Sequence, residues 1–201
     1  PLKDALLEIA AVTLKLNDKN HWCIDEVMSK HIKPFDGANL DAASLEFTGI
    51  DPDHPFRKQI AVTESEAFNE IFKVIRKKIK DNKCSRAILV GHNSSFDLSF
   101  LNACVERNNI KRNPFHPFSS FDTATLAGLI YGQTVLSKAA LAAGLECDDE
   151  EAHSARYDAE LTANLFSIIV NKFIYHFIFG FLVVNRRKFF FCRFPYRSTN
   201  H

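Results

Sequence analysis

A short apolar run that ends in glycine and leads into a helical pattern constrains the fold more than any other stretch. Residues Ala87–Val90 are too few for a helix and are typical of a buried strand, which Gly91 ends. Asn93, Ser94 and Ser95 are all favourable N-cap residues, so we expect a helix to begin there. The stretch therefore predicts a strand that passes directly into a helix.

Asp97 lies on the first turn of this predicted helix, just beyond the end of the strand. A carboxylate at that point can bind a metal ion. It can also simply complement the positive end of the helix dipole, which contributes about 0.3–1 kcal/mol. The position alone leaves both interpretations open.

A second pair of polar residues precedes and opens the last predicted helix. If His153 and Asp158 were both helical, five steps of about 100° would point their side chains about 140° apart. We therefore expect His153 on the preceding loop and Asp158 on the first turns, so that the two converge from different elements. This pattern is weak evidence alone, but strong when it is paired with Asn-x-x-Phe-Asp at residues 93–97.

The two stretches resemble the second and third motifs of the DEDD exonuclease superfamily, in its histidine-containing branch. Other segments resemble the bacterial ribonuclease T family, namely Asp4–Leu14, Pro34–Leu40, Phe47–Pro52, Lys111–Phe118 and Gly132–Lys138. The resemblance implies an α/β fold of the ribonuclease H-like kind, with a mixed β-sheet flanked by helices. It defines an exonuclease domain at residues 1–172 and a divergent or frame-shifted, Phe-rich basic tail at residues 173–201.

The first motif of that family, Asp-x-Glu, lies on a central strand before the position of Pro1. Glu8 matches a residue beyond that motif, and we do not assign it to catalysis. Because the chain starts at Pro1 and its one methionine is Met28, we expect an N-terminally incomplete reading frame. Without the central strand, we expect neighbouring strands with unpaired edges and no RNA trimming by residues 1–201 alone.

The resemblance assigns catalysis to Asp97, Asp158 and His153. The two aspartates would bind metal, with two Mg²⁺ ions expected in the complete enzyme, and His153 would be the general base. The implied activity is that of a 3′–5′ exoribonuclease that trims tRNA and other stable RNAs. Two alternatives remain open, a DNA proofreading-type 3′–5′ exonuclease and an inactive nucleic-acid-binding remnant that lacks Asp-x-Glu.

Three aromatic residues are implied in binding the 3′ end of the nucleic acid. By resemblance, Phe47, Phe96 and Phe118 would stack on bases, each stack contributing about 1–3 kcal/mol. Each could instead belong to the core, which is most plausible for Phe96 beside Asp97 and least plausible for Phe118 in a proline-bounded loop.

A basic cluster occupies residues 73–86, where seven Lys or Arg accompany a single acid, Asp81. The cluster is either a solvated helix face or a phosphate-binding patch. The resemblance favours the patch, at Lys80, Arg86, Lys111 and Arg112. In the ribonuclease T family such a patch on one subunit supports RNA bound at the other subunit's site, which implies a homodimer.

Bulk composition places further bounds on function. The tail holds five Lys or Arg and no acid, which leaves 20 basic against 24 acidic residues in the body. Five scattered cysteines without a Cys-x-x-Cys pair support neither a disulfide framework nor a zinc site, so a reducing cytoplasm fits best. No apolar stretch reaches the roughly 20 residues of a membrane span. We expect RNA, possible single-stranded DNA and a second copy of the chain as partners.

The remaining pattern predicts further elements along the chain. Alternation predicts two strands, and capping and periodicity predict helices separated by a rigid, proline-bounded loop at Asn113–Phe118. The predicted strands are Leu6–Leu16 and Val27–Phe35, and the predicted helices are Leu40–Phe47, one begun by the capping box Thr63 and Glu66, Thr123–Tyr131 capped by Asp122, Val135–Ala143 and Glu150–Val170.

Overall fold

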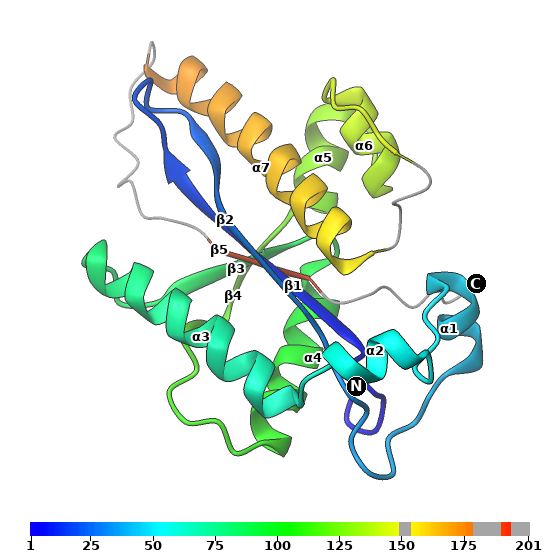
Figure 1. Ribbon diagram of the computed structural model, residues 1–201. Helices are drawn as coiled ribbons and strands as arrows, with labels where there is room; N and C mark the ends of the chain where they lie inside the picture. Colours follow the sequence, from blue (N-terminus) through cyan, green and yellow to red (C-terminus); the bar gives the residue numbers. More distant parts are fainter. Residues whose placement is uncertain (149–153, 179–189, 194–201) are drawn as a thin grey trace.

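The protein forms a mixed α/β fold in which one sheet lies between two layers of helices (Figure 1). The computed structural model describes residues 1–148, 154–178 and 190–193. The strands are β1 (Glu8–Leu16), β2 (Trp22–His31), β3 (Ala87–Gly91), β4 (Phe115–Asp122) and β5 (Phe190–Arg193). The helices are α1 (Ala42–Thr48), α2 (Pro55–Ile60), α3 (Glu64–Asp81), α4 (Ser94–Arg107), α5 (Thr123–Tyr131), α6 (Leu136–Ala142) and α7 (Ala155–Ile178).

The strand directions determine which strands start and which strands stop at each end of the sheet. The order is β2-β1-β5-β3-β4. β1 is antiparallel to both β2 and β5, whereas β3 is parallel to both β5 and β4. β1 and β3 therefore run in opposite directions, and β1 begins at the end of the sheet where β3 stops.

Both faces of β1 are covered. Ile9 and Ala11 belong to a core shared with α3 and α4, whereas Ala10 and Val12 belong to a second core shared with α7. The ribbon shows these helices on opposite sides of the sheet (Figure 1). This arrangement follows from the two-residue repeat of a strand, since successive side chains point to opposite faces.

Helix α3 confirms the predicted capping box. Thr63 Oγ1 accepts a hydrogen bond from Glu66 N at 3.3 Å, and Thr63 N donates to Glu66 Oε2 at 2.8 Å. The two bonds satisfy backbone donors that a helix start otherwise leaves unpaired. The apolar stripe of this helix is buried, with Phe68, Ile71, Phe72 and Ile75 all at 1% exposure or less.

The prediction of an irregular loop at Asn113–Phe118 is wrong from Phe115 onward, where β4 begins. β4 lies at the edge of the sheet, so the missing N–H of Pro117 removes no bond that an inner strand would need. The register between β3 and β4 also shifts, because Ala87 pairs with Phe115 but Leu89 pairs with Ser120. The edge strand therefore accommodates the proline.

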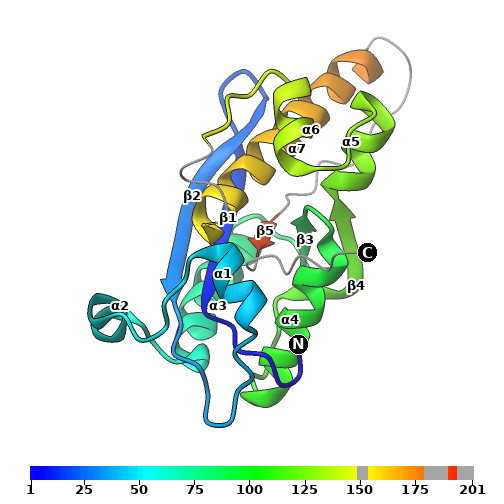
Figure 2. The ribbon, with the colours of Figure 1, turned by 90° about the vertical axis from the view of Figure 1, so that its right-hand side faces the viewer.

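Other boundaries differ from prediction. β2 spans Trp22–His31 rather than Val27–Phe35, and α7 continues to Ile178 instead of ending near Val170. α2 was not predicted, because its apolar residues Phe56 and Ile60 are 62% and 42% exposed and give no core-facing pattern. Figure 2 shows α2 projecting from the side of the molecule. Along the described residues, no helix is long and apolar enough to cross a membrane.

The centre of the sheet is filled from the basic tail. β5 pairs antiparallel with Ala10–Thr13 of β1 and parallel with Leu89 and Val90 of β3. The expectation that strands beside a missing central strand would keep unpaired edges is therefore wrong. Backbone hydrogen bonding connects all five strands through β5.

Candidate active site

The turn between β3 and α4 is fixed by hydrogen bonds from a neighbouring turn. The helix begins at Ser94, as predicted, but the N-cap residue Asn93 has a φ of 66° and makes no side-chain cap bond. Instead, Asn93 N donates to Asp122 Oδ1 at 2.8 Å, and Asp122 also accepts from Ala124 N at 2.9 Å. Asp122 thus caps α5, as predicted, and also ties the two turns together.

Asp97 is held against the last residue of β3. Its side chain is buried, at 1% exposure, on the first turn of α4. A Cβ atom added to Gly91 would lie only 2.5 Å from Asp97 Oδ2. A side chain at position 91 would therefore force the Asp97 carboxylate or the first turn of α4 to shift.

Asp158 lies on the first turn of α7 and is 7% exposed. The turn is capped by Ser154, whose Oγ accepts from Tyr157 N at 3.2 Å. On either side of Asp158, Ala155 and Ala159 are buried in the core that also contains Val90 of β3. This packing brings the helix start onto the end of β3.

The two aspartates lie at the same end of the sheet, where β3 stops and β1 starts. Asp97 follows the end of β3. α7 starts beside the beginning of β1, which lies at that end because β1 and β3 run in opposite directions. His153, the predicted general base, lies outside the described residues. The fold therefore places Asp97 and Asp158 at one end of the sheet, whereas the predicted convergence of His153 with Asp158 stays a prediction.

The residues at this end of the sheet fit a hard divalent cation only in part. Carboxylate oxygens are the ligands that Mg²⁺ prefers, and both aspartates are buried. However, no three His, Cys, Asp or Glu side chains form a metal-binding group within residues 1–148, 154–178 and 190–193. The described chain thus supplies a pair of candidate ligands and not a complete site.

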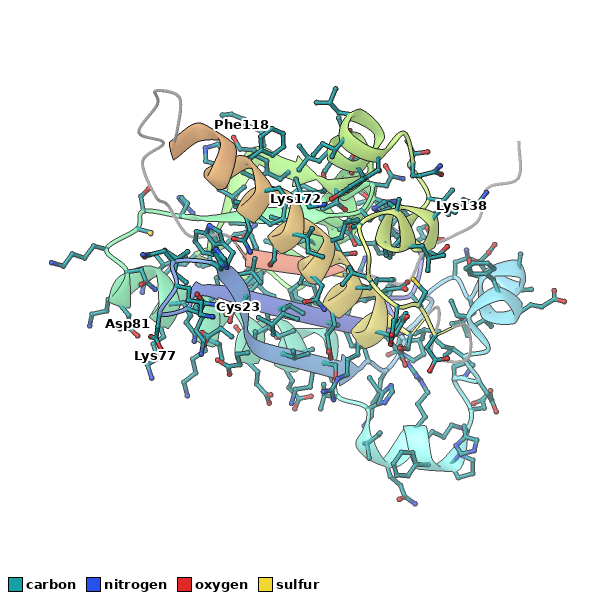
Figure 3. All side chains as sticks on the ribbon, turned by 90° about the horizontal axis from the view of Figure 1, so that it is seen from above. Cys23, Lys77, Asp81, Phe118, Lys138 and Lys172 are labelled. Atoms are coloured by element: carbon teal, nitrogen blue, oxygen red, sulfur yellow. The ribbon has the colours of Figure 1, made fainter. Side chains whose placement is uncertain are left out.

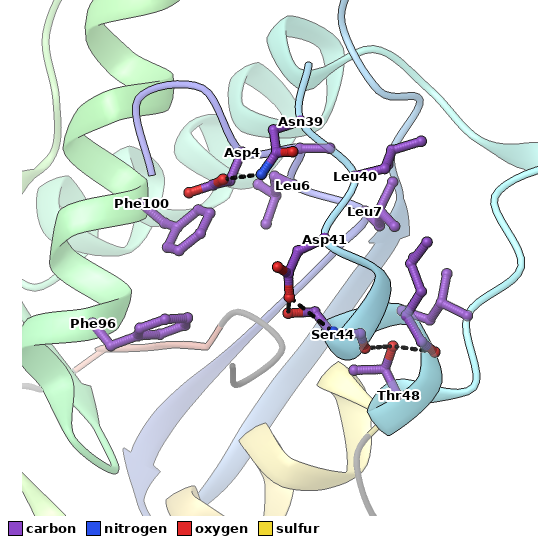
Figure 4. Close-up of a pocket in the computed structure, with 13 residues that line it drawn as sticks. Asp4, Leu6, Leu7, Asn39, Leu40, Asp41, Ser44, Thr48, Phe96 and Phe100 are labelled. Atoms are coloured by element: carbon purple, nitrogen blue, oxygen red, sulfur yellow. Dashed lines mark hydrogen bonds between the residues drawn. The ribbon is translucent and has the colours of Figure 1, made fainter. Parts of the chain in front are cut away.

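A pocket lies beside the first turns of α4 (Figure 4). Phe96 and Phe100 form one wall, and Leu6 and Leu45 contribute to the apolar lining. Polar residues also line it, and among them Asn39 Nδ2 donates to Asp4 Oδ1 at 2.8 Å and Ser44 Oγ donates to Asp41 Oδ2 at 2.7 Å. Phe96 directly precedes Asp97 in α4, but Asp97 itself does not line the pocket.

The three predicted stacking residues do not share one environment. Phe96 lines the pocket and also packs on the core, whereas Phe47 of α1 is 38% exposed and lies outside the pocket lining. Phe118 on the edge strand β4 is 79% exposed (Figure 3), and its ring centroid lies 4.5 Å from that of His116. The prediction that Phe118 is the least core-like of the three is confirmed.

The structure brings together the two predicted basic segments. Arg76 Nη2 donates to Arg112 O at 2.9 Å, and Arg86 Nη1 donates to Asn113 O at 2.6 Å. Lys80, Lys111 and Arg112 are exposed and form no ion pair with other described residues. We call Lys80, Arg86, Lys111 and Arg112 the basic surface.

The basic surface and the aspartates lie at opposite ends of β3. Arg86 directly precedes the strand at Ala87, whereas Asp97 packs against its last residue, Gly91. At about 3.3 Å per residue, a strand of this length separates the two by more than a phosphate contact can span. The basic surface is thus not part of the candidate site of its own chain.

Sequence reasoning missed a buried histidine in the same turn. His92 is 9% exposed, its Nδ1 lies 3.0 Å from Thr123 Oγ1, and its Nε2 lies 2.7 Å from Thr134 O. Both ring nitrogens are thus used to hold the start of α5 and the loop before α6. The sequence contains no signal for this role, because both partners are distant along the chain.

The profile of the exonuclease family matches residues 1–166, and the chain belongs to that family. Among solved structures, one described as "3′-end specific recognition of histone mRNA stem-loop by 3′-exonuclease" is similar. It has a TM-score of 0.55 at 14% identity, over 87% of this chain and 84% of that chain. A full-length 3′-exonuclease gives a TM-score of 0.53 at 13% identity, over 87% and 62%. These likenesses show the fold, which is consistent with a ribonuclease H-like α/β sheet.

Proposed function

We propose that the protein is a 3′–5′ exoribonuclease of the ribonuclease T type, which trims the 3′ ends of tRNA and other stable RNAs. The observation that carries this proposal is the burial of Asp97 and Asp158 at one end of the sheet, in a chain of the exonuclease family. The solved 3′-exonucleases of similar fold support the polarity and a nucleic-acid substrate. The free thiols Cys23, Cys84, Cys104 and Cys147 suit a reducing cytoplasm.

In this proposal, Asp97 and Asp158 would hold catalytic Mg²⁺, which would lower the pKa of an attacking water and stabilise the leaving oxygen. Asp97 is fixed by α4 and β3, and Asp158 is fixed by the capped first turn of α7. His153, just before that turn, takes the proton from the attacking water.

Aromatic and basic residues serve the nucleic acid at different places. The pocket beside Phe96 takes the terminal nucleotide, with Phe47 at its margin and the exposed Phe118 available to a more distant base. The basic surface binds phosphates. Since it lies at the opposite end of β3 from the aspartates, we propose that it serves the site of a second subunit in a homodimer.

The substrate is tested by comparing two nucleic acids under identical conditions. The full-length protein should trim a tRNA with an unpaired 3′ end in the presence of Mg²⁺, and should act more slowly on a DNA primer with a mismatched 3′ end. A strong preference for the primer would instead identify a proofreading-type DNA exonuclease. Binding of both without hydrolysis would identify a nucleic-acid-binding remnant.

The roles of the three polar residues are tested by substitution. General-base catalysis contributes about 10²–10⁴-fold, so His153→Ala should lose activity on that scale while it still binds metal and RNA. Asp97→Asn and Asp158→Asn should weaken metal binding as well as turnover. The measurements are RNA trimming and calorimetric Mg²⁺ titration. Loss of metal binding in His153→Ala, or intact metal binding in Asp97→Asn, would contradict the assignment.

A further inference from the structure

The carboxylate of Glu8 contacts several elements at the end of the sheet where the two aspartates lie. Glu8 is the first residue of β1, and its side chain is only 14% exposed. One oxygen contacts β2 and α2, because Oε1 lies 2.8 Å from His31 Nδ1 and accepts from Arg57 Nη1 at 3.1 Å. The other oxygen, Oε2, faces Ala155 N at 3.5 Å. Both oxygens of Glu8 are therefore engaged by donors.

The contact with Ala155 fixes the start of α7. Ala155 is the first residue of the helix, and its N–H is one of the donors that no carbonyl within a helix can reach. Ser154 caps the same turn through Tyr157 N. The Glu8 carboxylate provides a second cap from another part of the chain, and its negative charge is favourable near a helix N-terminus. Asp158 lies three residues beyond this contact.

Arg57 also holds Glu8 in place. It is 9% exposed and is the buried residue of α2, the helix whose apolar residues face solvent. Its Nη1 donates to Glu8, and its Nη2 donates to Leu7 O, which precedes Glu8 on the chain. The guanidinium therefore fixes both the side chain and the backbone at the beginning of β1. α2 is attached here by a charged contact rather than by apolar packing.

These contacts distinguish positioning from metal binding. A carboxylate ligand needs an oxygen lone pair directed at the ion, but Oε1 of Glu8 accepts from Arg57 and lies against His31 Nδ1, and Oε2 accepts from Ala155. The adjacent guanidinium charge also opposes a cation. We infer that Glu8 is a positioning residue, which fixes the first turn of α7 and so sets where Asp158 meets the substrate. The inference rests on the proposed exonuclease function.

The inference is tested with Glu8→Ala and Glu8→Gln in the full-length protein. Residues that orient metal ligands typically contribute about 10–100-fold to activity or metal affinity. Glu8→Ala should therefore lower kcat on that scale, with the KM for RNA unchanged, and should weaken Mn²⁺ binding in a calorimetric titration. Glu8→Gln should lose less, because its amide oxygen can still accept from Ala155 N.

Glu64→Ala provides a matched control. Glu64 is a similarly buried carboxylate that accepts from Arg107 Nη2 at 2.7 Å and from Asn108 Nδ2 at 2.8 Å, far along α4 from Asp97. It should lower thermal stability but leave kcat and Mn²⁺ affinity unchanged at temperatures where both variants are folded. Equal kcat losses in Glu8→Ala and Glu64→Ala would overturn the inference. Complete loss of metal binding in Glu8→Gln would also overturn it, because Glu8 would then be a ligand.

A structural readout separates this inference from the proposed function. Amide hydrogen exchange at Ala155 and Asp158 should accelerate in Glu8→Ala and not in Glu64→Ala. If the unaltered protein trims no RNA, the proposed function fails, while this exchange measurement still tests the role of Glu8. Unchanged exchange at α7 in Glu8→Ala would overturn the inference whatever the activity.

Discussion

Gly91 shows how little space the candidate site leaves around Asp97. In Gly91→Ala, the new Cβ would lie 2.5 Å from Asp97 Oδ2 and 3.0 Å from Ser94 Cα. Overpacking of this kind typically costs about 1–3 kcal/mol of stability. Because displacement of a reacting group by 1 Å can cost about 100-fold in rate, we expect a larger effect on kcat than on folding.

The measurements for Gly91→Ala are kcat for RNA trimming and thermal unfolding. Gly128→Ala is the control, since its Cβ also meets a neighbour, 3.2 Å from Thr134 Cγ2, but in α5 away from the aspartates. It should leave kcat unchanged. Wild-type kcat in Gly91→Ala would show that the Asp97 carboxylate does not need its present position.

At the scale of elements, charged pairs attach the outer face of α3 to β2. Lys78 contacts both Asp25 and Glu26, and Lys15 also lies 3.1 Å from Asp25. The hydrogen bond from Lys78 is the main cause that lowers the pKa of Asp25 below its ordinary value, against the opposing effect of burial. The same bond is the main cause that raises the pKa of Lys78.

These shifts predict how stability depends on pH. Since the folded-state pKa of Asp25 is lowered, its stabilisation is present above the unfolded pKa of about 4 and is lost as pH falls through the folded-state pKa. Since the folded-state pKa of Lys78 is raised, the stabilisation that the charged Lys78 provides is lost only as pH rises through a pKa above 10.5. Asp25→Asn should therefore cost about 1 kcal/mol in the free energy of unfolding at pH 7, and the difference should disappear in strong acid.

Denaturant unfolding at several pH values would measure this effect. Glu70→Gln is a suitable comparison, because Lys30 and Glu70 also connect β2 to α3 but Glu70 is 59% exposed. Its effect should be close to zero at every pH. A constant cost of Asp25→Asn down to strong acid would mean that packing, and not charge, holds this face together.

The sequence indicates elements well where local signals agree with tertiary packing. The capping box of α3 and the apolar run of β3 are examples. Prediction fails where neighbours override the local pattern, as at Pro117, which an edge strand tolerates, and in α2, which is attached through Arg57. The motifs indicate Asp97 and Asp158 as candidates, but their placement at one end of the sheet depends on the strand directions. The contact between Glu8 and Ala155 spans 147 residues and has no local signal.

At the scale of the whole molecule, the separation of the basic surface from the aspartates predicts a functional dimer. Lys80→Ala with Lys111→Ala removes two exposed charges from the basic surface, while Asp97→Asn inactivates the candidate site. Each variant should be weakly active alone. Random reassociation into two-fold dimers should restore about a quarter of the wild-type sites.

Trimming assays on the mixed variants and sedimentation at micromolar concentration measure this. Lys138→Ala on α6, an exposed charge elsewhere on the molecule (Figure 3), should have no effect alone or in mixtures. Activity that remains the average of the two separate variants, or a monomeric mass with undiminished trimming, would contradict the dimer.

The position of β5 also has a consequence for how the chain reaches its native state. β5 joins two halves, β1–β2 and β3–β4, and its Arg193 pairs with Ala10 from the other end of the described sequence. Such long loop closure carries an entropic cost before its contacts contribute, which slows folding. The antiparallel pair β1–β2 and the parallel pair β3–β4 should acquire protection in pulse-labelling hydrogen exchange first, and the amides shared with β5 last. Folding of this sheet is therefore expected to be limited by the arrival of its central strand.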